Sequence, residues 1–128
     1  MSYYISKLSD LNFEETLAKV EEELKIEGFG ILTEIDVKAT LKKKINVDFK
    51  KYKILGACNP PIAYEALSAE DKIGVLLPCN IIVEENDENQ VEVAAVNPMD
   101  AMSTVGNEAL AEIANTVTTK LQNVIDRI

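Results

Sequence analysis

The spacing of hydrophobic positions predicts two long amphipathic helices, one near each end of the chain. Apolar residues return every three or four positions, the period of one helix face, at Phe13, Leu17, Val20 and Leu24 and again at Leu110, Ile113, Val117, Leu121, Val124 and Ile128. Asn12 and Glu15 have the spacing of a capping box before the first helix, and Gly28 is suited to end it. Asn107 is placed to cap the second helix.

Five further segments predict β-strands, because they are rich in β-branched and aromatic residues. They cover residues 3–7, 29–35, 52–58, 73–85 and 90–96. The fourth is interrupted at Pro78, and since proline cannot donate to a sheet, we expect a bulge or an edge position there. Short helical inserts are expected at residues 37–44, 62–67 and 98–102.

The order of these elements indicates a single α+β domain over residues 1–128. The chain runs strand, helix, four strands with short helical inserts, and a long terminal helix. Two amphipathic helices need a common apolar surface, and one face of a five-stranded antiparallel sheet supplies it. The other face then lacks a long helix, and we expect a homodimer that covers its apolar surface.

Composition excludes several classes of function. The chain has no histidine, which removes Ser-His and Cys-His dyads and histidine-rich zinc or haem sites. It has no tryptophan, which disfavours stacking platforms for single-stranded nucleic acid. Two cysteines do not make a disulfide framework, and the N-terminus lacks the layout of a signal peptide. We therefore expect a cytoplasmic protein with two free thiols.

Charge is unevenly distributed along the chain. The net charge of −9 argues against nucleic acid and anionic membrane as partners. Between Lys38 and Lys53, however, seven lysines and one aspartate give a net charge of +6, so the remaining residues carry −15. Such a lysine cluster is usually a solvated helix face with the strand after it, and the alternative is a surface for an anion or an acidic partner.

Two short apolar runs end at a Cys-Asn pair beside a proline. One is Lys53–Pro60, containing Cys58 and Asn59, and the other is Gly74–Asn80, containing Cys79 and Asn80. Both cysteines of the chain are in these runs. Any chemical or binding function is therefore expected near these two pairs, with Pro60 and Pro78 beside them.

The runs Gly28–Asp36, Leu55–Pro60 and Leu76–Asn80 resemble one known family in their residues and their order. The chain is similar over its full length to the domain-of-unknown-function family numbered 302, a group of small bacterial and archaeal proteins. This resemblance implies a β-α-β(4)-α fold similar to one repeat of the TATA-box-binding protein, usually paired as a dimer. It implies no activity, and the fold likeness does not bring DNA binding with it.

Each candidate site has two interpretations. Cys58 and Cys79 are either small buried apolar side chains or, with Asn59 and Asn80, four groups that converge on one pocket. Asp36 is either a helix cap or one half of a carboxylate pair with Glu34. Two further observations are weaker: Tyr64 has no motif behind it, and Met99 with Met102 offers too few ligands for a copper site.

Together these observations predict a homodimeric small-ligand-binding or sensing domain. The candidate ligand-binding residues are Cys58, Asn59, Pro60, Pro78, Cys79, Asn80, Glu34 and Asp36. A thiol-dependent enzyme or redox carrier that uses Cys58 or Cys79 is the first alternative, and a structural protein-interaction module is the second. The sequence identifies no cofactor and no metal site, and leaves the ligand open.

Overall fold

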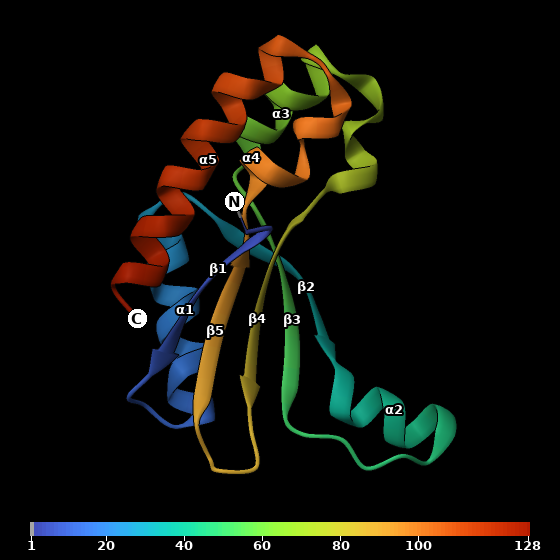
Figure 1. Cartoon of the computed structure of the whole chain (residues 1–128), viewed down its shortest axis with the longest axis vertical. Coiled ribbons are helices and arrows are strands. Elements are labelled where there is room, and N and C mark those ends of the chain that lie inside the picture. The colour runs from blue at the N-terminus through green and yellow to red at the C-terminus, as the bar shows by residue number, and fades with distance from the viewer. Residues whose placement is uncertain (1) are drawn as a thin grey trace.

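One antiparallel sheet of five strands forms the centre of the protein (Figure 1). The computed structural model describes residues 2–128. The spatial order of the strands is β1-β5-β4-β3-β2. The strands are β1 (Tyr4–Ser9), β2 (Gly30–Asp36), β3 (Tyr52–Cys58), β4 (Cys79–Glu85) and β5 (Val91–Val96). The helices are α1 (Phe13–Ile26), α2 (Val37–Ile45), α3 (Pro60–Ala69), α4 (Pro98–Ala101) and α5 (Glu108–Asp126), with short 3-10 helices η1 (Asp71–Leu76) and η2 (Ser103–Val105).

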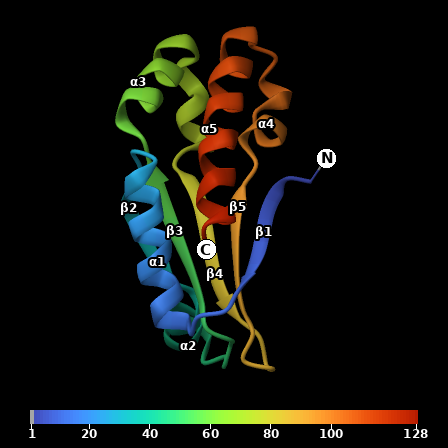
Figure 2. The ribbon, with the colours of Figure 1, turned by 90° about the vertical axis from the view of Figure 1, so that its left-hand side faces the viewer.

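The two predicted long helices, α1 and α5, cover the same face of the sheet (Figure 2). The predicted capping box begins α1, where the Glu15 backbone N–H donates to Asn12 Oδ1 over 2.8 Å. Asn107 caps α5 by accepting the Ala109 N–H over 3.0 Å. Among residues 2–128, no helix is both long and apolar enough to cross a membrane.

The hydrophobic core lies between the sheet and these two helices. Its large side chains that are at most 2% exposed include Val20, Leu24, Leu55, Ile81, Val83, Val93, Leu121 and Val124. Each such side chain contributes roughly 1.5–3 kcal/mol when it leaves water. The α+β class and the five-stranded antiparallel sheet predicted from the sequence are confirmed.

The opposite face of the sheet has no long helix over it within residues 2–128 (Figure 1). Because side chains alternate along a strand, the neighbours of the core residues point to this side. They form a hollow of about 460 Å³ that includes Tyr4, Ile82, Glu84, Glu92 and Val96, which we call the open-face hollow. It combines half-buried apolar side chains with two carboxylates.

The prediction of a strand over residues 73–85 was wrong in its first half. Asp71–Leu76 forms η1, and β4 starts only at Cys79. The peptide bond before Pro78 is cis. Because proline has no N–H to donate, the ladder begins after Pro78, and the expected bulge is absent from this position. The irregularity of the sheet lies instead in β2, between Ile31 and Thr33.

A lysine-rich segment extends from the end of β2, away from the rest of the molecule (Figure 1). We call residues 37–51, which comprise α2 and its connection to β3, the lysine arm. Asp36 caps α2 as predicted, since its Oδ1 accepts the Ala39 N–H over 2.9 Å. Asn46 ends the helix in a left-handed conformation with φ of 54°. Every residue of α2 is exposed or half-buried, so packing holds this helix only weakly.

Candidate functional site: a hollow beside two thiols

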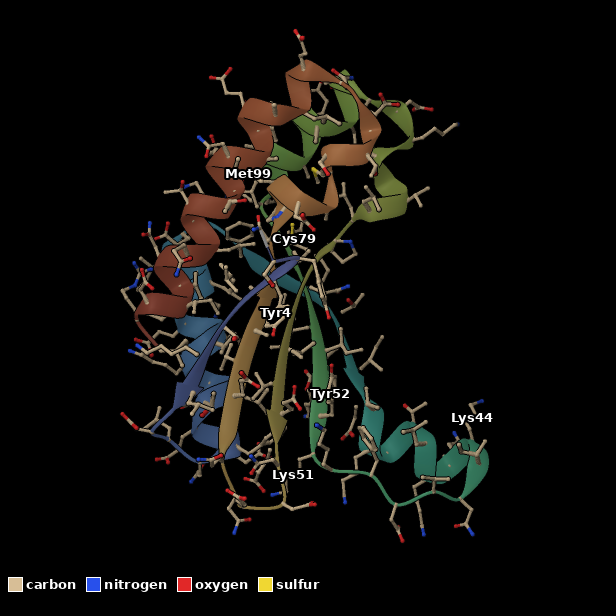
Figure 3. All side chains as sticks on the ribbon, in the orientation of Figure 1. Tyr4, Lys44, Lys51, Tyr52, Cys79 and Met99 are labelled. Carbon is tan, nitrogen blue, oxygen red and sulfur yellow. The ribbon has the colours of Figure 1, made fainter. Side chains whose placement is uncertain are left out.

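Cys58 and Cys79 lie on neighbouring strands at one end of the sheet and line the same hollow. Cys58 is the last residue of β3, Cys79 is the first of β4, and Cys79 pairs with Ala57 across the two strands. Figure 3 shows Cys79 where the sheet meets the helices above it. The hollow has a volume of about 310 Å³, and we call it the thiol hollow.

Helices and loops from distant parts of the sequence form the other walls of the thiol hollow. These walls include Phe29, Leu32, Ile62, Ala63, Ala66, Leu67, Leu77, Met102, Ile113 and Val117. The α3 wall exists because Asn59 caps this helix and two prolines begin it, which suits a first turn. Its apolar residues then recur on one side, at positions 62, 63, 66 and 67.

The lining of the thiol hollow is almost entirely apolar. Its side chains are hydrocarbon, thioether or thiol, with Asn59 as the one amide among the described residues. Within residues 2–128, no group of three or more Cys, Asp or Glu side chains is placed to hold a metal ion. An ion in this hollow would lose its water without gaining a counter-charge, which is costly. The lining therefore suits an uncharged, apolar occupant.

Asn59 uses its amide for the fold. Its Oδ1 accepts the Ile62 N–H over 3.4 Å at the start of α3, and its Nδ2 donates to the Glu27 carbonyl oxygen over 3.3 Å at the end of α1. Gly28 makes room for this contact, because a Cβ there would lie 2.9 Å from Asn59 Nδ2, and its φ of 86° also favours glycine. Asn59 thus joins α1 to α3 at the edge of the thiol hollow.

The Cys79 thiol is protonated near neutral pH. Burial in the core raises its pKa from 9.0 to about 11, and the neighbouring Cys58 adds to this shift. Only the thiolate is a strong nucleophile or a metal ligand. Both cysteines are free, as expected from the sequence. At neutral pH Cys79 therefore acts as an apolar part of the wall.

Gly56 allows the chain before β4 to pack closely against β3. A Cβ at this position would overlap Thr33 Oγ1 of β2 and would lie only 2.7 Å from Pro78 Cγ. At Gly30, in contrast, a Cβ would meet nothing within 4 Å. Gly56 therefore lets Pro78, a wall residue of the thiol hollow, sit directly on the sheet.

Comparison with known proteins identifies the family. The family described as "Domain of unknown function DUF302" matches residues 5–128. The chain belongs to this family. It is also similar to an uncharacterised conserved DUF302 protein from Bacillus stearothermophilus, with 29% sequence identity, a TM-score of 0.93, and coverage of 99% of this chain and 98% of that one. A comparison with curated proteins gives no match.

The DUF302 domain brings together four of the eight residues predicted from its sequence. Cys58, Asn59, Pro78 and Cys79 all line the thiol hollow. Asn80 does not join them: it is exposed and lines the open-face hollow, on the other side of the sheet. The expectation that two thiols and two carboxamides converge was therefore wrong, because consecutive strand residues point to opposite faces.

The remaining predicted residues lie elsewhere in the DUF302 domain. Pro60 is exposed in the first turn of α3. Glu34 forms an ion pair with Lys53 over 2.7 Å, and Asp36 is the α2 cap. Tyr64, which had no motif behind it, is 75% exposed on α3. Whether any of these residues binds a ligand stays a prediction.

Several wall residues of the thiol hollow were missed from the sequence. Ile62, Ala66 and Leu67 gave a usable signal, because their spacing marks one apolar side of α3. Met102 was considered from the sequence as a metal ligand, and it lines the hollow. Leu77 gave no usable signal, because it follows a 3-10 helix where a strand was predicted.

Proposed function

We propose that the protein is a homodimeric small-ligand-binding or sensing domain whose ligand occupies the thiol hollow. One observation supports this most strongly: residues from β2, β3, β4, α3, η1 and α5, and from the connections between them, converge on a single apolar hollow beside both cysteines. Concave, mostly apolar pockets with few polar groups are the usual form of small-molecule sites. The hollow is also open at Leu32 and Leu67, which are 68% and 44% exposed and would be covered by a ligand.

The ligand we propose is uncharged and apolar. The volume of about 310 Å³ is at the lower end of the roughly 300–1,000 Å³ typical of ligand pockets. It is about twice the roughly 150 Å³ of an engineered apolar cavity that binds benzene. A compact aromatic or branched aliphatic molecule fits this size. Selection would then depend on shape and on exclusion of charge.

The state of the thiols favours binding over thiol chemistry. A catalytic or redox cysteine needs a lowered pKa, an electropositive environment and access to its reagent. Cys79 has a raised pKa and is only 9% exposed, so the thiol enzyme or redox carrier has no support from this residue. Two free cysteines also agree with the cytoplasmic location that we propose.

The homodimer in this proposal is supported by the uncovered face of the sheet. Tyr4 is 43% exposed and Leu8 is 56% exposed on the edge strand β1, beside the open-face hollow. Neighbouring exposed apolar side chains of this kind are a common feature of protein interfaces. A second copy is the partner that a single protein species always has available.

The ligand part of the proposal is tested by titration with N-phenyl-1-naphthylamine, an uncharged apolar probe whose fluorescence rises in an apolar site. Ala63→Phe adds a ring from the α3 wall and should fill much of the hollow. Ala69→Phe, at the exposed end of the same helix, is the matched control. We expect wild type and Ala69→Phe to bind alike, and Ala63→Phe to bind at least about tenfold more weakly, a difference of about 1.4 kcal/mol.

Two results would contradict the ligand proposal. One is the absence of saturable binding to wild type, and the other is equal binding to the filled variant and its control. Circular dichroism of all three proteins checks that they remain folded. If Ala63→Phe does not fold, Leu67→Trp is the second filling variant, because Leu67 is 44% exposed at the rim and tolerates a larger side chain more readily.

A further inference from the structure

The lysine arm exposes both charge and apolar surface at a distance from the core. Ile45 is 63% exposed and Val47 is 42% exposed, so the arm leaves apolar side chains in water. The main contacts of α2 are with β2 and β3, at the edge of the sheet. A nine-residue helix with this little support is marginal in isolation, and a partner surface would stabilise it.

Two lysines at the end of α2 are free to pair with another molecule. Lys38 is occupied within the arm, since it donates to the Phe49 carbonyl oxygen over 2.8 Å. Lys42 pairs with Asp48 over 3.1 Å. Lys43 and Lys44 make no ion pair with any residue in the described range 2–128. The exposed end of α2 therefore carries two uncompensated positive charges.

The open-face hollow carries negative charge that lysine side chains of the same chain neutralise only in part. Glu84 and Glu92 are directly opposite each other on β4 and β5, and like charges in this position repel. Lys50 forms an ion pair with Glu84. Glu92 has no ion-pair partner within residues 2–128, although it is half-buried beside Tyr4 and Ile82. The hollow thus offers one unpaired carboxylate in an apolar surround.

We propose that the lysine arm of one copy docks in the open-face hollow of a second copy, and the reverse, about a two-fold axis. Lys43 and Lys44 would pair with Glu92, while Ile45 and Val47 would cover Tyr4 and Ile82. This inference rests on the homodimer part of the proposed function and specifies its interface. Because the same two patches serve both copies, the contact is isologous and closes at two chains.

Charge and placement favour a second copy over other partners. The chain outside the lysine cluster carries −15, which repels nucleic acid and anionic membranes even where the arm attracts them. A second copy brings that acidic surface to the arm. The α2 part of the arm lies away from the hollow of its own chain, as Figure 3 shows by the separation of Lys44 from Tyr4 and Tyr52, and the arm reaches that hollow only at its other end, where Lys50 pairs with Glu84.

The test measures self-association by analytical ultracentrifugation of three variants. Lys43→Glu/Lys44→Glu reverses the arm, and Glu92→Lys reverses the hollow. Lys25→Glu/Lys72→Glu is the matched control for the reversed arm, because it makes the same change in net charge at side chains elsewhere that are 70% and 84% exposed. We expect the reversed arm and the reversed hollow each to weaken the dimer at least about tenfold, and the control to leave it within about threefold of wild type.

Mixing the two reversed variants gives the decisive result. In a heterodimer of these two variants, the reversed arm of one chain meets the reversed hollow of the other, and the second contact joins a wild-type arm to a wild-type hollow. Both contacts then join opposite charges. We therefore expect a stable heterodimer from two proteins that associate poorly alone. Failure of the mixture to associate would overturn the inference. Reversed variants that dimerise as well as the control would overturn it too, and would leave a homodimer through another surface.

A cross-linking measurement on the wild-type sequence tests the same contact if a variant does not fold. A mixture of ¹⁴N- and ¹⁵N-labelled wild-type chains is treated with a carbodiimide, which joins lysine and carboxylate side chains in contact. We expect mixed-isotope peptides that link residue 43 or 44 to residue 92. A wild-type dimer without such links would overturn the inference, and a monomeric wild type would overturn it together with the homodimer proposal. Probe binding in the thiol hollow is unaffected by either outcome.

Discussion

Cys79 should react slowly with disulfides in the folded protein, and the size of the effect follows from its surroundings. Burial raises the thiol pKa from 9.0 to about 11. At pH 8 this lowers the thiolate fraction from about one in ten to about one in a thousand, which is roughly hundredfold. A more basic thiolate is a better nucleophile and regains roughly tenfold, given a Brønsted coefficient of about 0.4–0.5. We therefore expect a net slowing of at least about tenfold, before steric protection.

The assay follows modification of Cys79 by 2-hydroxyethyl disulfide, a small uncharged reagent, with peptide mass spectrometry to separate the two cysteines. The reference is the same residue in urea at the same pH. Since Cys79 is only 9% exposed, steric hindrance slows the folded protein further. The rate should also rise about tenfold per pH unit between pH 8 and 10, because the thiolate fraction does so below the pKa.

A folded-state rate within about threefold of the rate in urea would refute the reasoning. It would mean that Cys79 is neither desolvated nor shielded, and the thiol enzyme would again be a serious alternative. Cys58, which is half-buried, provides an internal comparison within the same folded molecule.

Three further predictions concern stability and are checked by urea unfolding. Gly56→Ala should lower the free energy of unfolding by about 1–3 kcal/mol, because the added methyl group overlaps its neighbours. Gly30→Ala, where the added methyl group meets open space, should change the free energy of unfolding by less than about 1 kcal/mol. Equal effects of the two substitutions would contradict the packing described. Cys79→Ala should cost about 1–2 kcal/mol, because it removes one buried sulfur atom, and a cost above about 4 kcal/mol would show a larger structural role. The hydrogen bond from Arg127 lowers the pKa of Glu27 from its ordinary value of 4.5. The pair therefore stabilises the folded protein fully above pH 4.5, and this stabilisation is lost as the pH falls through the lowered pKa of the folded state. Arg127→Ala should therefore be less stable than wild type at pH 7, with a gap that narrows below pH 4.5; a gap independent of pH would contradict this.

Much of the fold was predictable because local signals agreed with the final packing. The helix at Phe13–Ile26 combines a capping box, a regular apolar face and a terminal glycine, and each signal depends only on nearby residues. The first three strands and the fifth were found for the same reason. The segment before Pro78 was not, because its apolar run fits a buried strand and a buried 3-10 helix equally well.

The candidate site was only partly predictable because its walls come from distant parts of the chain. The sequence marked Cys58 and Cys79, and antiparallel pairing of β3 with β4 brings them together. Asn80 was grouped with them although a residue beside Cys79 on a strand must face the other way. The walls from α3 and α5 depend on how these helices pack over the end of the sheet, which no local pattern specifies.

The most direct test of the proposed site is where an apolar ligand contacts the protein. The measurement is a set of nuclear Overhauser effects between bound N-phenyl-1-naphthylamine and methyl-labelled protein. We predict contacts to the methyl groups of Leu77, Ile113 and Val117, which line the thiol hollow. Contacts only to Ile82 and Val96, in the open-face hollow, would contradict the proposed site, as would the absence of any contact.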